Sequence, residues 1–471
     1  MRTIFRSIST VLILAAAAFA QAQPAQTQST LPPELRDQID KAAKDVLSKT
    51  GVPSASVAVV KDGRIAYLQA YGDARLEPHL PATPQMRYSI GSISKQFTAA
   101  AILLLQQQGK LSLDDKVSRF IPNLTRANEV TIRQLLSHTS GYQDYWPQDY
   151  VPPMMLKPIS AQQIMDMWAR KPLDFDPGVK WQYSNTNFVI AGAIIEKVSG
   201  MSLLQFLQKS VFAPLSMTTV FNTDEHKLAD TDPAGYFRYG LGPLRPAPKE
   251  GPGWMFAAGE LAMTAEDLAK WDVSMIDQKV LSPASYKQME TEVLLNSGVG
   301  SGYGLGVDVG MQSGHRAISH TGEVSGFTAA NTVYPDERVA IAVLTNQDAA
   351  SAGSIIARRI APLLFTTADA ATAEKTRQAR SIFEDLQHGK VNRTLFTDDT
   401  NAYFNDQALQ DFASGLAPLG SPESFTQTGQ SLRGGMTLRV FSAKFPNKTL
   451  RIWTYEMPDG KLEQYQIAAT D

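Results

Sequence analysis

Hydrophobic and polar positions near the start of the chain predict one helix and one hairpin. Apolar residues recur at the spacing of a helical face over residues 35–47, and Gly51 follows where a helix would stop. Two β-rich runs, residues 54–60 and 64–71, flank the turn Lys61-Asp62-Gly63. Because Asp-Gly favours tight turns between antiparallel strands, we expect a β-hairpin there.

The next strong pattern is a helix that is apolar on most of its faces. It covers residues 94–108, and Gly109 closes it; such a helix belongs in the interior of a sizeable domain. Helical patterns then alternate with Pro/Gly-rich loops, and β-like runs follow at residues 303–309, 315–320, 328–334 and 339–345. Strands at both ends with helices between them predict an α+β domain whose first and last strands share one antiparallel sheet.

A second, smaller unit is predicted at the C-terminal end. Residues 367–376 are small and polar, so we interpret them as a linker. One helix at about residues 376–387 then precedes four β-like stretches with turns at Gly434-Gly435, Pro446-Asn447 and Pro458-Asp459-Gly460. The expected unit, residues 377–471, is a small α+β accessory domain.

The first residues are typical of an export signal. Arg2 and Arg6 precede a short apolar run at residues 11–20, and small residues suited to signal peptidase follow. The alternative is a membrane anchor, but the run is shorter than the roughly 18 residues of a span. We therefore predict a signal peptide at residues 1–22, a linker at residues 23–31, and a periplasmic or secreted mature protein with no stable membrane span.

Composition excludes several classes of function. Among 471 residues, 43% are hydrophobic, 19% are charged, and the net charge is −2, with no run rich in Lys and Arg. This balance gives no electrostatic reason to bind nucleic acid. The chain has no cysteine, which removes thiol nucleophiles and cysteine-based metal sites. No metal-ligand or phosphate-binding spacing occurs, so we expect no metal, no cofactor, and a small-molecule or peptide substrate; a protein partner stays unknown.

The first candidate for chemistry is Ser92-Ile93-Ser94-Lys95, at the mouth of the apolar helix. Residues three apart on a helix share a face, so Lys95 can lie beside the Ser92 hydroxyl. A serine hydroxyl needs a neighbouring base to become a nucleophile, and a lysine whose pKa is lowered by burial can be that base. The pattern is short, and a polar start of a helix would explain it equally well.

Two further short patterns follow along the chain. Tyr183-Ser184-Asn185 lies where a loop enters an apolar helix, so Tyr183 could relay a proton and Asn185 could hydrogen-bond a substrate amide. His320-Thr321-Gly322 closes a β-like run, and Gly322 would let a substrate backbone approach the strand edge. Each pattern has an ordinary structural explanation when it is taken alone.

Together and in this order, the three patterns resemble those of the serine β-lactamase and penicillin-binding-protein superfamily. The likeness extends to Tyr88-Ser89-Ile90-Gly91-Ser92, to the run from Leu135 to Gly141, and to Gly302-Tyr303-Gly304-Leu305-Gly306, which look like its class C and esterase/D-peptidase branch. The resemblance implies a β-lactamase/transpeptidase-like fold over residues 32–366: an antiparallel sheet flanked by helices, plus an all-helical subdomain. In the run from Leu135 to Gly141, His138 is interpreted as structural.

The resemblance also implies a two-step acyl transfer. Ser92 would attack a carbonyl group, Lys95 and Tyr183 would share the base and acid roles, and the backbone N–H groups of Ser92 and Glu323 would form the oxyanion hole. Asn185, His320, Thr321, Gly322 and Glu323 are thus the expected substrate-binding residues.

One residue departs from most β-lactamases. They have lysine where this chain has His320, which is mostly neutral at pH 7. We therefore expect an ester or peptide substrate, D-amino-acid peptides included, and weak β-lactamase activity at most. The alternative is a sensor that is acylated without turnover, or a binding protein, of the same fold.

Overall fold

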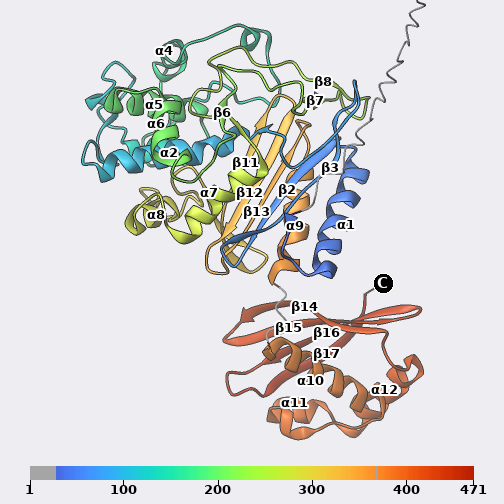
Figure 1. Ribbon diagram of the computed structural model, residues 1–471. Helices are drawn as coiled ribbons and strands as arrows, with labels where there is room; N and C mark the ends of the chain where they lie inside the picture. The colour runs from blue at the N-terminus through green and yellow to red at the C-terminus, as the bar shows by residue number, and fades with distance from the viewer. Residues whose placement is uncertain (1–27, 366–369, 471) are drawn as a thin grey trace, which may run out of the picture.

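The computed structural model describes residues 28–365 and 370–470, and the predicted signal peptide lies outside them. Figure 1 shows a larger α+β domain built around an antiparallel sheet, with a helical lobe on one side, and a smaller α+β domain at the C-terminal end. The predicted fold class is confirmed.

The central sheet joins strands from both ends of the large domain. Its order is β1-β3-β2-β13-β12-β11-β10, and β4 pairs with β3 at one side. The first long strand of the hairpin, β2, pairs antiparallel with β13, as the sequence predicts. The strands are β1 (Gln28–Ser29), β2 (Ser54–Lys61), β3 (Arg64–Arg75), β4 (Leu80–Pro81), β10 (Asp308–Gln312), β11 (His315–Val324), β12 (Phe327–Tyr334) and β13 (Val339–Thr345). Strand β1 pairs with β3, so Gln28–Ser29 of the predicted linker at residues 23–31 join the edge of the sheet.

Helices cover both faces of this sheet. Successive side chains of β2 point to opposite faces, so Val57 and Val59 pack under α1 and α9, whereas Ala58 and Val60 join the core of the helical lobe (Figure 1). The helices are α1 (Pro33–Thr50), α2 (Ser94–Gln107), α3 (Ile132–Leu136), α4 (Ala161–Ile164), α5 (Asn185–Ser199), α6 (Leu203–Leu207), α7 (Ala265–Asp277), α8 (Pro283–Met289) and α9 (Ala352–Phe365). Short strands pair beside the lobe: β5 (Tyr88–Ser89), β6 (Phe221–Asn222) and β9 (Leu261–Met263) in one sheet, and β7 (Tyr236–Phe237) with β8 (Arg245–Pro246) in another.

Among the described residues, no single helix has the length and hydropathy of a membrane span. One pair bent by 69°, Asn185–Ser199 with Leu203–Phe212, meets the length and composition test together.

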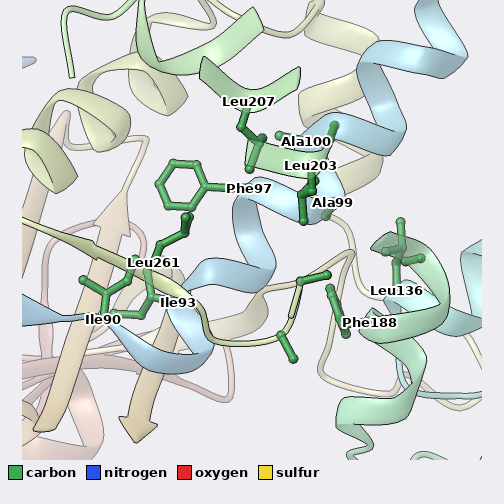
Figure 2. Packing of buried hydrophobic residues seen from close by; sticks show 14 of the residues in the cluster. Ile90, Ile93, Phe97, Ala99, Ala100, Leu136, Phe188, Leu203, Leu207 and Leu261 are labelled. Atoms are coloured by element: carbon green, nitrogen blue, oxygen red, sulfur yellow. The ribbon is translucent and has the colours of Figure 1, made fainter. Parts of the chain in front are cut away.

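Helix α2 is buried at the centre of the helical lobe. Its predicted bounds agree with the structure to within one residue, and Figure 2 shows Phe97 among Ile93, Leu203 and Leu207. The Phe97 ring also lies 5.0 Å from Trp271, measured between ring centroids. A helix packed on all sides is held rigidly, so the residues at its start are held rigidly as well.

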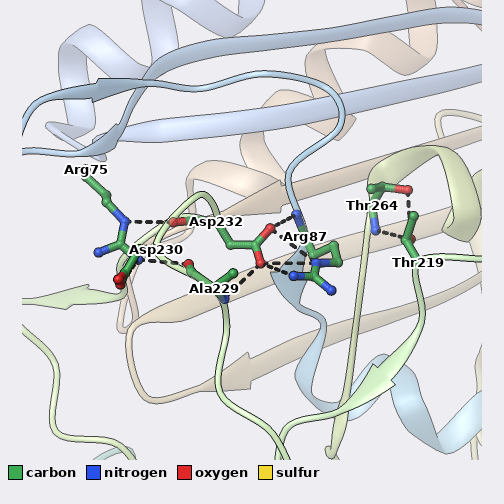
Figure 3. Close-up of polar contacts among 7 residues, drawn as sticks. All are labelled: Arg75, Arg87, Thr219, Ala229, Asp230, Asp232 and Thr264. Carbon is green, nitrogen blue, oxygen red and sulfur yellow. Dashed lines mark hydrogen bonds and ion pairs between the residues drawn. The ribbon is translucent and has the colours of Figure 1, made fainter.

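A buried ion pair anchors the segment that leads into α2. The Asp232 carboxylate accepts hydrogen bonds from the backbone N–H of Arg87 at 3.0 Å and from the Arg87 guanidinium at 2.5 Å (Figure 3). It also accepts the backbone N–H of Ala229 at 3.0 Å. Asp232 is buried, so its charge is compensated by several donors at once. These contacts fix the chain immediately before β5, three residues upstream of Ile90.

Strand β11 is longer than the sequence predicts. The expected run ends at His320, but the strand continues to Val324 because β12 pairs with it as far as the two-residue turn. Gly322 therefore lies inside a strand. A Cβ atom at Gly322 would lie 1.9 Å from the carbonyl oxygen of Ile90. The glycine thus makes room for the protein's own backbone on that side of β11, and the approach of a substrate backbone to the strand edge stays a prediction.

The small domain packs helices on one face of a four-stranded antiparallel sheet. The sheet runs β14 (Ser424–Arg433), β15 (Met436–Phe445), β16 (Lys448–Glu456) and β17 (Leu462–Ala469), with the three predicted turns between them. Three helices occur where one was expected: α10 (Ala370–Gln387), α11 (Asp398–Tyr403) and α12 (Asp406–Leu416). Helix α10 begins at Ala370, inside the predicted linker at residues 367–376, because alanine is small but is also the strongest helix former.

The close approach at Gly322 gives a test of the fold. Gly322→Ala should lower the free energy of unfolding by about 1–3 kcal/mol, because the added methyl group meets backbone that cannot rotate away. Urea unfolding followed by circular dichroism measures this change. Gly310→Ala is the matched control, since a Cβ atom there meets nothing within 4 Å. Equal stability of the two variants would contradict the contact.

Candidate active site

Ser92 lies at the floor of a pocket of about 640 Å³. It sits in the 3₁₀ turn η1 (Gly91–Ile93), immediately before α2, and its side chain is half-buried. Tyr183, Asn185 and Glu323 line the same pocket. The structure thus brings residues of the first two sequence patterns, and Glu323 directly after the third, to one place.

Lys95 is fully buried directly beside Ser92. Its Nζ atom lies 2.8 Å from each of three oxygens, namely Ser92 Oγ, Asn185 Oδ1 and the carbonyl oxygen of Ala258. The amide and carbonyl oxygens can only accept hydrogen bonds. When Lys95 is neutral, its two protons therefore go to these two oxygens, and its lone pair faces the Ser92 hydroxyl.

The environment of Lys95 favours this neutral form. Burial lowers the pKa of Lys95 from its ordinary value to about 7, and the charge of Asp144 raises it only in part. Near pH 7 a substantial fraction of Lys95 can therefore accept a proton from Ser92, which an ordinary lysine cannot do.

Tyr183 closes the other side of Ser92. It lies in the loop immediately before α5, where the sequence placed it, and its ring centroid is 4.9 Å from Lys95 Nζ. Burial raises the pKa of Tyr183 well above its usual range, and a hydrogen bond with the Ser92 side chain offsets only part of that rise. The phenol stays protonated, so it is suited to donate a proton.

His138 packs against the loop that carries Tyr183. It is fully buried, its ring centroid lies 4.2 Å from that of Tyr183, and its Nδ1 atom accepts the backbone N–H of Ser184 at 3.2 Å. Burial holds the pKa of His138 well below its ordinary value, so the ring is neutral. These contacts fit the structural role expected for it.

Asp144 is hydrogen-bonded to Asn185, the residue that contacts Lys95, and it was not identified from the sequence. Its carboxylate accepts the backbone N–H of Asn185 at 2.9 Å and the side-chain amide at 3.3 Å. Because the amide nitrogen of Asn185 points to Asp144, its oxygen must point to Lys95. Asp144 therefore orients the acceptor that holds the lysine. It follows the Leu135–Gly141 run by three residues, but nothing in its spacing marks it.

His320 is buried near Tyr183 and Lys95, and its ring is neutral. Its Nδ1 atom can only donate to the Thr321 carbonyl oxygen, so Nε2 accepts the hydroxyl of Tyr303 at 2.8 Å. Burial and the charge of Lys95 lower the pKa of His320 to about 3. Tyr303, in the Gly302–Gly306 run, is thus a partner of His320 that the sequence analysis did not assign.

The other two residues of this pattern lie apart from the pocket around Ser92. Thr321 is exposed, and it lines a neighbouring hollow together with Gly322 and Glu323.

The backbone segments that carry the Ser92 and Glu323 N–H groups meet beside Ser92. A Cβ atom at Gly91 would lie 2.6 Å from Glu323 N, and one at Gly322 would lie 3.2 Å from Ser92 N, so the two segments are in backbone contact. Val324 pairs with Phe327 across a two-residue turn, which makes Glu323–Thr328 a pair without ladder hydrogen bonds. The Glu323 N–H therefore points away from β12. Strand β10 pairs with β11 only as far as Ser319, so this N–H stays available near Ser92.

The described residues contain no group of three or more side chains that could hold a metal ion. Two similar short patterns occur away from the pocket: Lys49-Thr50-Gly51 ends α1, and Tyr403-Phe404-Asn405 ends α11 in the small domain.

Comparison with known proteins agrees with this arrangement. The sequence matches the Beta-lactamase family over residues 39–364. Penicillin-binding protein 4* of Bacillus subtilis is 30% identical over 313 residues, which cover 63% of this chain and 68% of that protein.

Two solved structures resemble the chain. A D-stereospecific amidohydrolase from Streptomyces sp. has a TM-score of 0.60 and 26% identity, covering 70% of this chain and 98% of that one. An octameric penicillin-binding protein homologue from Pyrococcus abyssi has a TM-score of 0.61 and 23% identity, covering 92% of this chain and 99% of its own.

The lowered pKa of Lys95 predicts how Ser92 reactivity depends on pH. Labelling of Ser92 by a neutral sulfonyl fluoride should speed up as the pH rises through about 7, because Lys95 must lose its proton before it can accept one. Mass spectrometry of timed samples between pH 5 and pH 10 measures the rate, and Ser92→Ala corrects for labelling elsewhere. A rate that rises only near pH 10 would show an unperturbed lysine.

Proposed function

Because the chain belongs to the beta-lactamase family, we propose that it is an exported serine hydrolase that forms a covalent acyl-enzyme on Ser92. Its substrates are esters or peptides, D-amino-acid peptides included, and its β-lactamase activity is weak at most. The observation that carries this proposal is the buried Lys95 Nζ atom, 2.8 Å from Ser92 Oγ and held by two acceptors.

In the acylation step, Ser92 Oγ attacks the substrate carbonyl carbon while its proton passes to neutral Lys95. The carbonyl oxygen gains negative charge, which the N–H groups of Ser92 and Glu323 stabilise. The bond to the leaving group then breaks, and the leaving group takes a proton from Tyr183, which Lys95 can replenish. In the second step, water attacks the ester and Ser92 regains its proton.

His320 argues against a carboxylate-bearing β-lactam as the main substrate. A buried ring with a pKa of about 3 carries no charge at neutral pH, and its Nε2 atom already accepts the Tyr303 hydroxyl. It therefore supplies no fixed positive charge for an anionic group. The similarity to a D-stereospecific amidohydrolase supports amides and peptides as the alternative class.

Export is proposed from the N-terminal pattern of residues 1–22, and the protein is expected in the periplasm or outside the cell. We assign no catalytic residue to the small C-terminal domain.

The first test compares the parent protein with Ser92→Ala on p-nitrophenyl acetate and butyrate. The parent should release p-nitrophenol continuously, and the variant should lose activity by a factor of about 10³ or more, because the nucleophile is gone. Ser297→Ala, an exposed serine outside the pocket, is the matched control. Equal activity of the parent and Ser92→Ala would disprove the assignment. A single stoichiometric burst without turnover would establish the acylated sensor instead.

Tyr183→Phe tests the proton donor separately. The substitution keeps the ring that packs on His138 and removes only the hydroxyl, so kcat should fall by about 10²–10⁴ while KM changes little. Steady-state kinetics on the same esters measure both constants. Tyr239→Phe, at an exposed site, is the control. An unchanged kcat would show that Lys95 acts without Tyr183.

A further inference from the structure

The pocket above Ser92 carries an unusual balance of charge. Four carboxyl groups line it, from Asp144, Asp149, Glu323 and Asp348, and among the described residues its lining contains no lysine or arginine. Lys95 lies beneath Ser92, outside the lining, and burial disfavours its charged form. An anion that enters the pocket is therefore repelled, whereas a cation is attracted.

Two of these carboxylates are fixed in place by backbone contacts. Glu323 Oε1 accepts the N–H of Ala349 at 2.7 Å, and Asp348 Oδ2 accepts the N–H of Gly326 at 3.0 Å. The segment after β13 thus holds the side chain of Glu323 at the end of β11, and the turn after β11 holds the side chain of Asp348. Among the described residues, the second carboxylate oxygen of Glu323 accepts no hydrogen bond, so it is available for another partner.

The ionised carboxylates of Glu323, Asp348 and Asp149 repel one another. Partial burial and the nearby charges of Asp348 and Asp149 raise the pKa of Glu323, and partial burial raises the pKa of Asp348. Like charges kept close together without a counter-ion are unfavourable. A bound cation would relieve this repulsion.

The pocket also has aromatic side chains in its lining, which is an independent observation. Trp146, Tyr150 and Trp181 line it, and Tyr150 and Trp181 are exposed. Exposed aromatic faces attract organic ammonium groups because the ring face carries partial negative charge. A pocket lined by both carboxylates and aromatic rings suits such a group.

We propose that this pocket selects substrates that carry an organic ammonium group near the scissile carbonyl, with Glu323 and Asp348 as the residues that set this preference. The proposal rests on the hydrolase activity proposed above and names the substrate class of the same site.

Isosteric substrate pairs test it. The first pair is the p-nitrophenyl ester of trimethylammoniobutyrate and its isostere, in which a tert-butyl group replaces the trimethylammonium group on the acyl side. The second pair, acetylthiocholine and its tert-butyl isostere, places the charge on the leaving group. In each pair only the charge changes, so the ratio of the two kcat/KM values measures the preference for the charged substrate. Comparison of the two pairs shows whether the pocket recognises a charge on the acyl group or on the leaving group.

The parent should prefer the ammonium member of at least one pair by about tenfold or more. Glu323→Gln and Asp348→Asn should each reduce this ratio by about fivefold, since each removes one charge and keeps an oxygen for its backbone donor. Asp37→Asn, which removes the same charge on α1, should leave the ratio unchanged. Added salt should also reduce the parent's ratio.

A ratio at or below one in both pairs would overturn the inference, as would a ratio that neither pocket variant lowers. If p-nitrophenyl acetate is still hydrolysed through Ser92 in that case, the proposed function stands and only the charge preference fails. If no ester is turned over through Ser92, the proposed function fails and the charge preference fails with it.

Discussion

The structure around Ser92 depends on the burial of one amine. A lysine ammonium group is costly to remove from water, and Lys95 has no carboxylate in direct contact to compensate it. It can stay there because three oxygens satisfy its hydrogen bonds and because it can shed its proton near neutral pH. The cost of burying Lys95 is thus the reason why it can be unprotonated near pH 7 and accept a proton from Ser92.

Residues distant in sequence must be placed together for this to work. The nucleophile and the lysine come from the start of α2, Asn185 from the start of α5, and the third oxygen from Ala258 before β9. The apolar contacts of α2 and the anchor between Arg87 and Asp232 hold the first of these rigidly. The hydrogen bond from the Asn185 amide to Asp144 then fixes the orientation of that amide.

Sequence patterns predicted the parts of the fold that depend on local chemistry. The apolar helix after Ser92, the Asp-Gly hairpin and the four C-terminal strands with their turns follow from periodicity and turn residues. The helix from Ala370 was missed because alanine and threonine are common to linkers and helices. Asp144 and Tyr303 were missed for another reason: their roles arise from contacts across 41 and 17 residues, which no local pattern encodes. The same holds for Gly322, whose neighbour is Ile90.

The backbone contact between Gly91–Ser92 and Gly322–Glu323 separates two tasks of the pocket. The pair of N–H groups is set by main-chain geometry, so its spacing does not depend on any side-chain rotamer. The walls above it belong in part to loops, at residues 146–151 and 346–350. Changes of side chain in those loops can alter which molecule is admitted while the apparatus below keeps its dimensions. Such a division lets the walls diversify during evolution at little risk to the chemistry, as loops on a rigid scaffold generally do.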